Sequence, residues 1–497
     1  MTTITLLPDV TAFLERPHGQ FIDGKPIINS TSPQLSVINP ASGEQIAAVH
    51  TAQSPELDAA TDSARRAFRG SWANTSPAQR AALLLNLAER IQQHRESLAQ
   101  IETLQSGKLI NLSRLFEIDQ ASAFLRHFAG AATRISGETI TPSLPSFNGE
   151  HYSAFTRREP IGVVAGIVPW NFATMIAIWK IGAALSTGCT IVIKPSEFTP
   201  LTMMRIAELA IEAGIPPGVI NVVNGAGETG RQLIEHPNIA KVSFTGSVPT
   251  GIAVGHIALD ARLTRFTLEL GGKNSVGFLP DVPVEKIING VIEAGFIHQG
   301  QICAAGERFF VHRNHLDEVL EKIGPALNGL KIGNPLDEDS QFGPLANKAH
   351  LEKVGALLAR ARTEASCEII HGGAAIEGPG YYFSPTVLRA SDRKATLLHE
   401  ETFGPVATFM AYDNEEDLMD LFNDTPFGLS ASLWTNDLSK ALNYIPKIEA
   451  GTVWVNMHNL LDPAVPFGGI KQSGLGREFG SAFIDDYTEL KSVFIRH

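Results

Sequence analysis

The strongest constraint on the fold is a regular alternation of strand-like and helical segments through the middle of the chain. Five short apolar runs are typical of buried strands: Val163–Ile167, Thr190–Ile193, Val219–Val223, Lys241–Phe244 and Arg265–Leu270. Helical segments separate these runs at Met175–Ser186, Leu201–Ala213, Glu228–Glu235 and Thr250–Leu259. The alternation predicts an α/β fold with a Rossmann-like, doubly wound parallel sheet, which binds ligands at the carboxyl ends of its strands.

A second α/β region and a strand-like tail complete the predicted architecture. Between about 272 and 466, "RFFVH", "EIIHGG" and "GTVWVN" indicate strands, and "HLDEVLEKIGPAL" and "KAHLEKVGALLARAR" indicate helices. Ahead of the first sheet, "FIDGKPII" predicts a short hairpin, and helices are expected from Ser54 onward. The tail "DDYTELKSVFIRH" ends in a strand whose open edge predicts pairing with another subunit.

Composition excludes several classes of protein. The 497 residues are 44% apolar and 19% charged, which is typical of a globular chain of roughly two to four domains. The net charge of −12 disfavours nucleic acid and acidic membrane surfaces as partners. Three cysteines (Cys189, Cys303 and Cys367) cannot form a disulfide framework and predict a reducing, cytoplasmic location. No targeting peptide, membrane span or metal site is expected, because none of these patterns occurs.

One glycine motif predicts less than it first suggests. "VINVVNGAGETG" contains Gly225, Gly227 and Gly230 in a G-x-G-x-x-G pattern after a strand. The dinucleotide fingerprint also needs an acid about 20 residues later, at the end of the next strand. That strand ends in "KVSFTG", without an acid. The glycines alone are therefore a weak cofactor signal, since glycine is common in strand-to-helix turns.

Two other loops indicate a dinucleotide more strongly. "IVIKPSE" ends a strand with Lys194 and Glu197, and the carboxylate can accept hydrogen bonds from the adenosine ribose. It would repel a 2′-phosphate, so NAD is favoured over NADP. "FTGSVPTG" places Gly246, Ser247 and Gly251 between a strand and a helix, where backbone amides suit a diphosphate.

Three residues form a candidate catalytic set. Cys303 lies in "FIHQGQICAAGERFF", between two glycine-containing turns; it is either a buried apolar residue or a nucleophile. Glu269 ends an apolar strand; it is either a salt-bridged or N-capping residue, or a general base with a raised pKa. Asn171 follows a strand, as a turn residue or as a donor to an oxyanion.

These motifs together resemble the non-acylating, NAD(P)-dependent aldehyde dehydrogenase superfamily. From about Phe21 to the C-terminus the chain carries "PWNF", "KPSE", "FTGS", "LELGGK", "GQICAAGER", "EETFGPV" and "PFGGIKQSGLGRE" in the family's order. The resemblance implies that Cys303 is the nucleophile, Glu269 the general base and Asn171 the oxyanion donor. It implies NAD contacts from Ile167, Pro169, Trp170, Lys194, Glu197, Gly227, Gly246, Ser247, Gly251, Leu270, Glu401 and Phe403. One departure is Ala173, where the family often has proline.

The resemblance also implies how the chain divides. An NAD-binding domain is expected from 1–137 and 161–271, and a catalytic domain from 272–465. A small bridging sheet is expected from 138–160 and 479–497. Its outer strand should pair with a second copy and give a homo-oligomer, either a dimer or a tetramer.

The substrate tunnel is expected, by alignment, to be apolar. Its predicted lining is Phe172, Met175, Ile176, Trp179, Ile297, Ile302, Asn459, Leu461 and Phe467, of which three are aromatic. Without an arginine to pair a carboxylate, an acidic semialdehyde is disfavoured. A quaternary ammonium aldehyde would need more aromatic side chains and a carboxylate. The C-terminal stretch resembles bacterial phenylacetaldehyde dehydrogenases, which implies phenylacetaldehyde as substrate.

Two rival functions are weighed against aldehyde oxidation by water. An inert scaffold on the same fold could lose the thiol, the carboxylate or the amide without penalty, yet all three are present. A CoA-acylating relative generally lacks a glutamate at the position of Glu269. NADH formation from the aldehyde without CoA separates this rival from the expected reaction.

Overall fold

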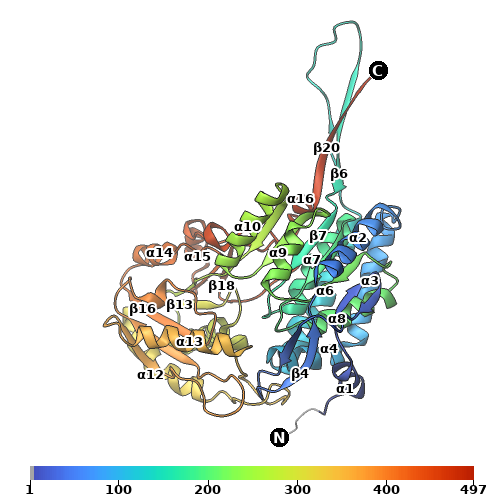
Figure 1. Cartoon of the computed structure of the whole chain (residues 1–497). Helices are drawn as coiled ribbons and strands as arrows, with labels where there is room; N and C mark the ends of the chain where they lie inside the picture. Colours follow the sequence, from blue (N-terminus) through green and yellow to red (C-terminus); the bar gives the residue numbers. More distant parts are fainter. Residues whose placement is uncertain (1–4) are drawn as a thin grey trace.

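The computed structural model describes residues 5–497. Residues 1–4 belong to the predicted NAD-binding domain and to the N-terminal stretch in which no targeting peptide is expected, and they lie outside the described residues. Two α/β bodies lie side by side, each built on a mainly parallel sheet, and a narrow arm projects from one end (Figure 1). The α/β fold predicted from the alternation of segments is confirmed.

The first sheet has eight strands in the order β19-β11-β10-β7-β8-β9-β1-β2. Its parallel part consists of β7 (Val163–Ile167), β8 (Thr190–Lys194), β9 (Ile220–Val222), β10 (Ile239–Thr245) and β11 (Arg265–Glu269). The connecting helices are α7 (Ala173–Thr187), α8 (Leu201–Glu212), α9 (Gly227–Glu235) and α10 (Val248–Arg262). The strand order reverses between β7 and β10, and a doubly wound sheet binds its ligand beyond the carboxyl ends of strands at such a point.

The N-terminal part closes one side of this sheet. The predicted hairpin is β1 (Gln20–Ile22) and β2 (Lys25–Ile27); Asp23 and Gly24 both have positive φ, as a tight turn requires. The predicted helices are α2 (Ser54–Arg69), α3 (Pro77–Gln93) and α4 (Arg95–Ser106). Elements that the sequence analysis did not predict are α1 (Pro8–Glu15), β3 (Gln34–Ile38), β4 (Gln45–His50), α5 (Ile110–Leu112), the π-helix η1 (Ser113–Asp119) and α6 (Gln120–Ala132).

The second sheet has seven strands in the order β14-β15-β16-β13-β12-β17-β18. The strands are β12 (Asn274–Phe278), β13 (Gly306–His312), β14 (Cys367–His371), β15 (Thr386–Ala390), β16 (Val406–Tyr412), β17 (Ser430–Trp434) and β18 (Thr452–Val455). All neighbours are parallel except β14 and β15. The helices are α11 (Val284–Gly295), α12 (Arg313–Asn328), α13 (Lys348–Ala361), α14 (Glu415–Asn423) and α15 (Leu438–Tyr444).

A short strand from the end of the chain returns to the first sheet. In β19 (Gly474–Leu475), Gly474 lies opposite Glu269 and Leu475 opposite Leu268, in antiparallel register. The backbone N–H of Leu270 donates to the carbonyl of Ser473 at 2.9 Å. The end of β11, which carries the candidate base, is therefore held on its outer side by the C-terminal segment.

The projecting arm is a three-stranded sheet. It comprises β5 (Thr139–Ile140), β6 (Tyr152–Pro160) and β20 (Thr488–Arg496), the last preceded by the short helix α16 (Phe483–Tyr487). Strand β20 pairs with β6 along its whole length, and its other edge has no partner within residues 5–497. Leu490 is 58% exposed and Phe494 66% exposed on this arm, which stands clear of the two bodies in Figure 1.

Among residues 5–497, no helix combines the length and the apolar character needed to cross a bilayer.

Candidate active site

Cys303 lies where two cavities meet. One cavity is apolar and contains Phe172 and Trp179; the other contains Asn171 and Glu269; Cys303 belongs to the wall of both. A thiol in this position can react with a molecule in either cavity. The three residues singled out from the sequence are thus brought together, although they are distant along the chain.

A strained turn delivers Cys303 to this position. In the 3-10 turn η2 (Ile297–Gly300), His298, Gln299 and Gly300 all have positive φ, of 50°, 55° and 67°. A Cβ added at Gly300 would lie 2.3 Å from the carbonyl oxygen of Gly404, so only glycine fits there. Strain of this kind is usual where a structure fixes a functional group.

Four side chains hold the loop that follows. The carbonyl of Gln301 accepts from Asn171 Nδ2 at 2.9 Å, and the carbonyl of Cys303 accepts from Asn274 Nδ2 at 2.8 Å. The next carbonyl, of Ala304, interacts with Ser430 Oγ at 3.1 Å and with His458 Nε2 at 2.7 Å. These hydrogen bonds hold the backbone of the nucleophile loop in place, and a fixed backbone favours a defined angle of attack by the Cys303 thiol.

Glu269 has the environment of a carboxyl group that resists ionisation. Its side chain is 5% exposed, and neither carboxylate oxygen has a hydrogen-bond partner within the described part of the chain. Burial, with the charge of Glu478 added, raises the pKa of Glu269 well above its usual value, although Lys180 and Arg477 oppose this. Such a group is a weak acid at neutral pH and, once ionised, a strong base.

A buried ion pair lies behind Glu269. Lys180 Nζ donates to Glu478 Oε1 at 2.8 Å and to Ser243 Oγ at 3.0 Å. A Cβ added at Gly468 would lie 2.7 Å from Glu269 Oε1, so the backbone of the C-terminal segment closes tightly over the carboxyl group.

The thiol of Cys303 is protonated in the protein alone. Burial first, and then the charges of Glu269 and Glu401, raise the pKa of Cys303 to about 12. The nucleophile must therefore lose its proton when the cavities are filled, because the thiolate is the reactive form.

A long groove leads from Cys303 across the carboxyl ends of β7, β8 and β10. Most of the predicted NAD contacts line it or the adjoining cavity: Ile167, Pro169, Trp170, Lys194, Glu197, Gly227, Gly246, Ser247, Leu270, Glu401 and Phe403. Gly251 does not line the groove, since it packs against Leu270, where an added Cβ would lie 2.4 Å from a Leu270 methyl carbon. Its place is behind the wall, letting α10 approach the strands closely.

The groove fits an elongated anionic ligand with a ribose at its far end. Ser247 is the N-cap residue of α10, so the positive end of that helix faces the groove beside Gly246. Glu197 lies 4.0 Å from Lys194 and is about one-third exposed, free to accept from ribose hydroxyls. No atom lies within 4 Å of a Cβ added at Gly227, so this wall leaves room.

The near end of the groove is shaped by residues of the second body. Glu401 accepts from the backbone N–H of Gly272 at 2.8 Å, and burial raises its pKa to about 7. Phe403, with φ of 56°, packs edge-on against Trp170 at 5.4 Å. His350, which sequence reasoning missed, contacts the Phe403 carbonyl at 2.7 Å and lines the same cavity with Lys353.

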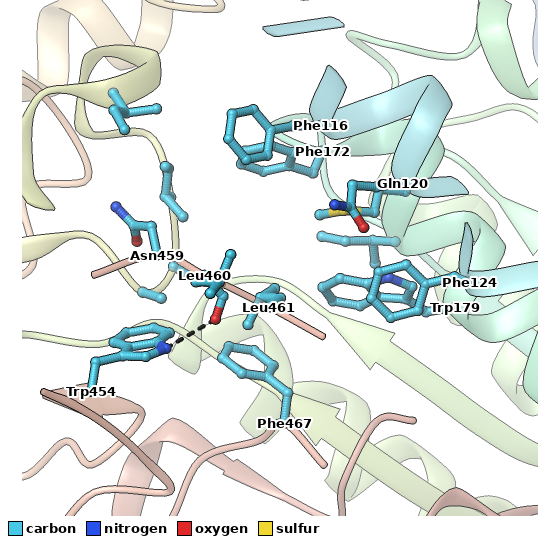
Figure 2. A pocket seen from close by; sticks show the side chains of 16 residues that line it. Phe116, Gln120, Phe124, Phe172, Trp179, Trp454, Asn459, Leu460, Leu461 and Phe467 are labelled. Atoms are coloured by element: carbon cyan, nitrogen blue, oxygen red, sulfur yellow. Dashed lines mark hydrogen bonds between the residues drawn. The ribbon is translucent and has the colours of Figure 1, made fainter. Parts of the chain in front are cut away.

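All nine residues predicted for the substrate tunnel line the apolar cavity (Figure 2). Sequence reasoning missed Phe116, Gln120, Phe124, Trp454 and Leu460. Three of the nine predicted residues are aromatic, and the added Phe116, Phe124 and Trp454 bring the aromatic side chains that line the cavity to six, with Phe172, Trp179 and Phe467.

Apart from the Cys303 thiol and the indole N–H groups, the polar side chains of this cavity are two amides. Figure 2 shows Asn459 on the left near Trp454, and Gln120 on the right near Phe124 and Trp179. Among the residues that the structure describes, no carboxylate and no cationic side chain line it. Within residues 5–497, no group of three or more histidine, cysteine, aspartate or glutamate side chains is arranged to hold a metal ion.

Comparison with known proteins agrees with this geometry. The sequence matches the aldehyde dehydrogenase family over residues 27–493. It is 39% identical to a phenylacetaldehyde dehydrogenase of Pseudomonas fluorescens, with 100% of this chain and 99% of the relative covered. It is also 39% identical to a betaine aldehyde dehydrogenase of Cereibacter sphaeroides, with 96% of each chain covered.

Solved structures give the same result. The NAD+ complex of an aldehyde dehydrogenase from Bacillus cereus superposes with a TM-score of 0.96 at 40% identity, covering 99% of both chains. The thiol, the carboxyl group and the amide thus meet on a fold shared along the whole chain with these relatives. The chain belongs to the aldehyde dehydrogenase family.

Proposed function

We propose that this chain oxidises phenylacetaldehyde to phenylacetate with NAD. The observation that carries the proposal is the position of Cys303 in the wall shared by an aromatic cavity and a dinucleotide-shaped groove. The similarity to a phenylacetaldehyde dehydrogenase and to a relative solved with NAD+ supports it. Three free cysteines support a reducing, cytoplasmic location.

The residues of the groove fit NAD. Backbone amides at the start of α10 would hold the diphosphate, and Glu197 the adenosine ribose. Glu401 and Phe403 would hold the nicotinamide end beside Cys303. When bound, the cofactor supplies a hydride acceptor.

The chain's own groups would carry the remaining steps. The Cys303 thiol passes its proton to solvent by way of the Glu269 carboxylate, which lines the same cavity. The thiolate then attacks the aldehyde carbon, and the carbonyl oxygen becomes an oxyanion. One N–H of the Asn171 amide is held by the Gln301 carbonyl, which leaves the second N–H to donate to that oxyanion. Loss of a hydride from the carbon converts the thiohemiacetal on Cys303 into a thioester. Glu269 takes a proton from water, the resulting hydroxide attacks the thioester carbon, and the carboxylic acid leaves as the thiolate returns.

The cavity supports an aryl substrate on energetic grounds. Burying a phenyl group contributes roughly 2 kcal/mol at about 25 cal/mol per Å². Edge-to-face contacts with the surrounding rings contribute about 1 kcal/mol more. Together they favour phenylacetaldehyde over acetaldehyde by about two orders of magnitude in kcat/KM.

A betaine-type aldehyde is the second candidate, favoured by the six aromatic side chains, since quaternary ammonium groups bind to aromatic faces. The absence of a carboxylate from the cavity wall speaks against it. The test is kcat/KM with NAD for phenylacetaldehyde, acetaldehyde, hexanal and betaine aldehyde. A lead for betaine aldehyde, or equal values for the aryl and acetyl substrates, would refute the proposal.

We also propose the division into domains and the assembly expected from the resemblance. The NAD-binding domain is 1–137 with 161–271, the catalytic domain is 272–465, and the bridging segment is 138–160 with 479–497. The exposed apolar side chains of the arm support its packing against a second copy, as a dimer or tetramer. Strand β20 would then extend a sheet of its neighbour.

A further inference from the structure

A fully buried cluster of charges lies beside the corner that carries Asn171. Lys108 pairs with Glu117 and lies 3.7 Å from Glu102, and the side chains of all three are 0% exposed. Burying three charges costs a large desolvation energy, which similar apolar residues would avoid. A cluster of this kind calls for a role beyond stability.

The cluster acts on the first turn of α7. Glu117 Oε2 accepts from the backbone N–H of Met175 at 2.8 Å, and Glu102 Oε2 accepts from Thr174 Oγ1 at 3.2 Å. The N-cap residue of this helix is Phe172, whose side chain cannot accept a capping hydrogen bond. Glu117 therefore supplies, from another segment, a hydrogen-bond acceptor for a backbone N–H in the first turn of this helix.

The same cluster contacts the N-cap residue directly. The Lys108 ammonium lies over the Phe172 ring, 4.2 Å from its centroid. The His298 ring meets Phe172 edge-on at 5.5 Å and belongs to the strained turn before Cys303. Phe172 is thus held between the charge cluster and the nucleophile turn, and Asn171 precedes it in the chain.

The backbone that presents Glu117 is unusual. It belongs to the π-helix η1, a conformation that is rare and frequent at functional sites. Within this π-helix Glu117 and Ile118 are buried, whereas Leu115 is 50% exposed. Burial raises the pKa of Glu117 to about 8, although Lys108 opposes this.

We propose that Glu117 and Lys108 are positioning residues, which fix the start of α7 and thereby aim the Asn171 amide at the oxyanion. The inference rests on the proposed dehydrogenase reaction. Neither residue lines the cavities at Cys303. Both act indirectly: Glu117 contacts the backbone of Met175, and Lys108 contacts the ring of Phe172. If the cluster had only a structural role, its removal would lower the stability of the fold, and any loss of activity would be the same whether or not Asn171 is present.

A double-mutant cycle separates the two roles. Glu117→Gln is expected to lower kcat/KM by about tenfold in the wild-type background and by less than about twofold when Asn171 is already alanine. NAD affinity, measured by fluorescence titration, should be unchanged in both. Equal losses in the two backgrounds, or no loss in the first, would overturn the proposal.

Asp119→Asn is the matched control. Asp119 belongs to the same π-helix and pairs with Arg95 through two contacts of 2.6 Å, and the hydrogen-bond partners of its side chain within residues 5–497, Arg95 and Gln92, lie outside α7. It should lower the melting temperature while leaving kcat/KM within about twofold of wild type. A loss of activity equal to that of Glu117→Gln would show a general structural effect and refute the positioning role.

Two further arms keep the outcome clear. If Glu117→Gln does not fold, Glu117→Asp replaces it in the cycle. Aspartate keeps a carboxyl group beside Lys108 but is too short to reach the backbone N–H of Met175. The same coupling with Asn171→Ala is expected, and additive losses of activity would overturn the proposal. The wild-type chain is assayed first with the aldehyde panel. An inactive wild type would refute the proposed function, whereas additive losses in an active enzyme refute only the positioning role.

Discussion

The Asn171 amide donates to the Gln301 carbonyl, two residues before Cys303, at 2.9 Å. This contact joins the segment before α7 to the nucleophile loop, and Asn171 lines the cavity that Cys303 and Glu269 share. Asn171→Ala is therefore expected to lower kcat by about 10²–10³, or about 3 kcal/mol of oxyanion stabilisation. Steady-state kinetics with phenylacetaldehyde measure this, and a kcat within a few-fold of wild type would exclude Asn171 as a donor.

Cys303→Ala should abolish aldehyde oxidation, because no other thiol lies in either cavity. NAD binding should survive, since the groove is lined mainly by backbone and by other side chains. Cys367→Ala is the control, because Cys367 lies on β14 and lines neither of the two cavities nor the cofactor groove. Oxidation by the Cys303 variant at a wild-type rate would refute the assignment of the nucleophile.

Glu269→Gln should slow release of the acid by about 10²–10⁴, the usual contribution of a general base. Hydride transfer should be affected less, so a burst of NADH should precede a slow steady state. Rapid-mixing absorbance at the NADH band records both phases. Full turnover without a burst would show that another group activates water.

The same substitution should change stability with pH. Because burial raises the pKa of Glu269, the carboxyl of the folded chain stays protonated after that of the unfolded chain has ionised. The contribution of this group to stability is thus complete below the unfolded pKa and is lost as pH rises toward the folded pKa. Glutamine does not ionise, so the variant should gain melting temperature over wild type at about pH 8 but little at about pH 5. An equal difference at both pH values would contradict the raised pKa.

Glu197→Ser should narrow the preference for NAD over NADP. The carboxylate that would repel a 2′-phosphate is about one-third exposed, so a change of about tenfold in the ratio of kcat/KM values is expected. Glu228→Ser is the matched control, since Glu228 lines the same groove but is paired with Arg231. An unaltered ratio in Glu197→Ser would exclude this residue from cofactor choice.

Removing "LKSVFIRH" should yield monomers or insoluble chain, because β20 would lose most of its pairing with β6. The double variant Leu490→Glu with Phe494→Glu keeps the strand and should give soluble monomers by sedimentation velocity. Leu438→Glu, at a 66% exposed position on α15, should leave the assembly unchanged. Native size in the arm variants would refute the proposed interface.

The strands of the first sheet could be predicted because each is a short apolar run between turn residues. The helices could be predicted because they fill the segments between these runs, and the local sequence pattern is enough to identify both kinds of element. The hairpin of β3 and β4 was missed although Leu35 and Val37 of β3 are less exposed than Gln34 and Ser36, because an alternation over five residues is too short to stand out from a loop. The π-helix η1 was missed for another reason. Its residues suit an α-helix equally well, and its widened turn depends on the contacts that Glu117 makes in the folded chain.

The candidate site divides in the same way. Residues within motifs could be predicted, and the structure brings Cys303, Glu269 and Asn171 together. Phe116, Gln120 and Phe124 could not be predicted, because residues four apart on a helix indicate an ordinary core stripe. Only the packing of η1 and α6 against the cavity turns that stripe toward the substrate.

The run from Leu461 to Arg496 has a consequence for engineering. It lines the aldehyde cavity, then passes beside Glu269 as β19, and ends as the outer strand of the arm. A chimaera that takes this run from a relative would change three features at once: the wall of the aldehyde cavity, the strand that pairs beside Glu269, and the outer strand of the arm. Substrate range is therefore better altered through η1 and α6, whose residues line the cavity and belong to a separate segment from the projecting arm.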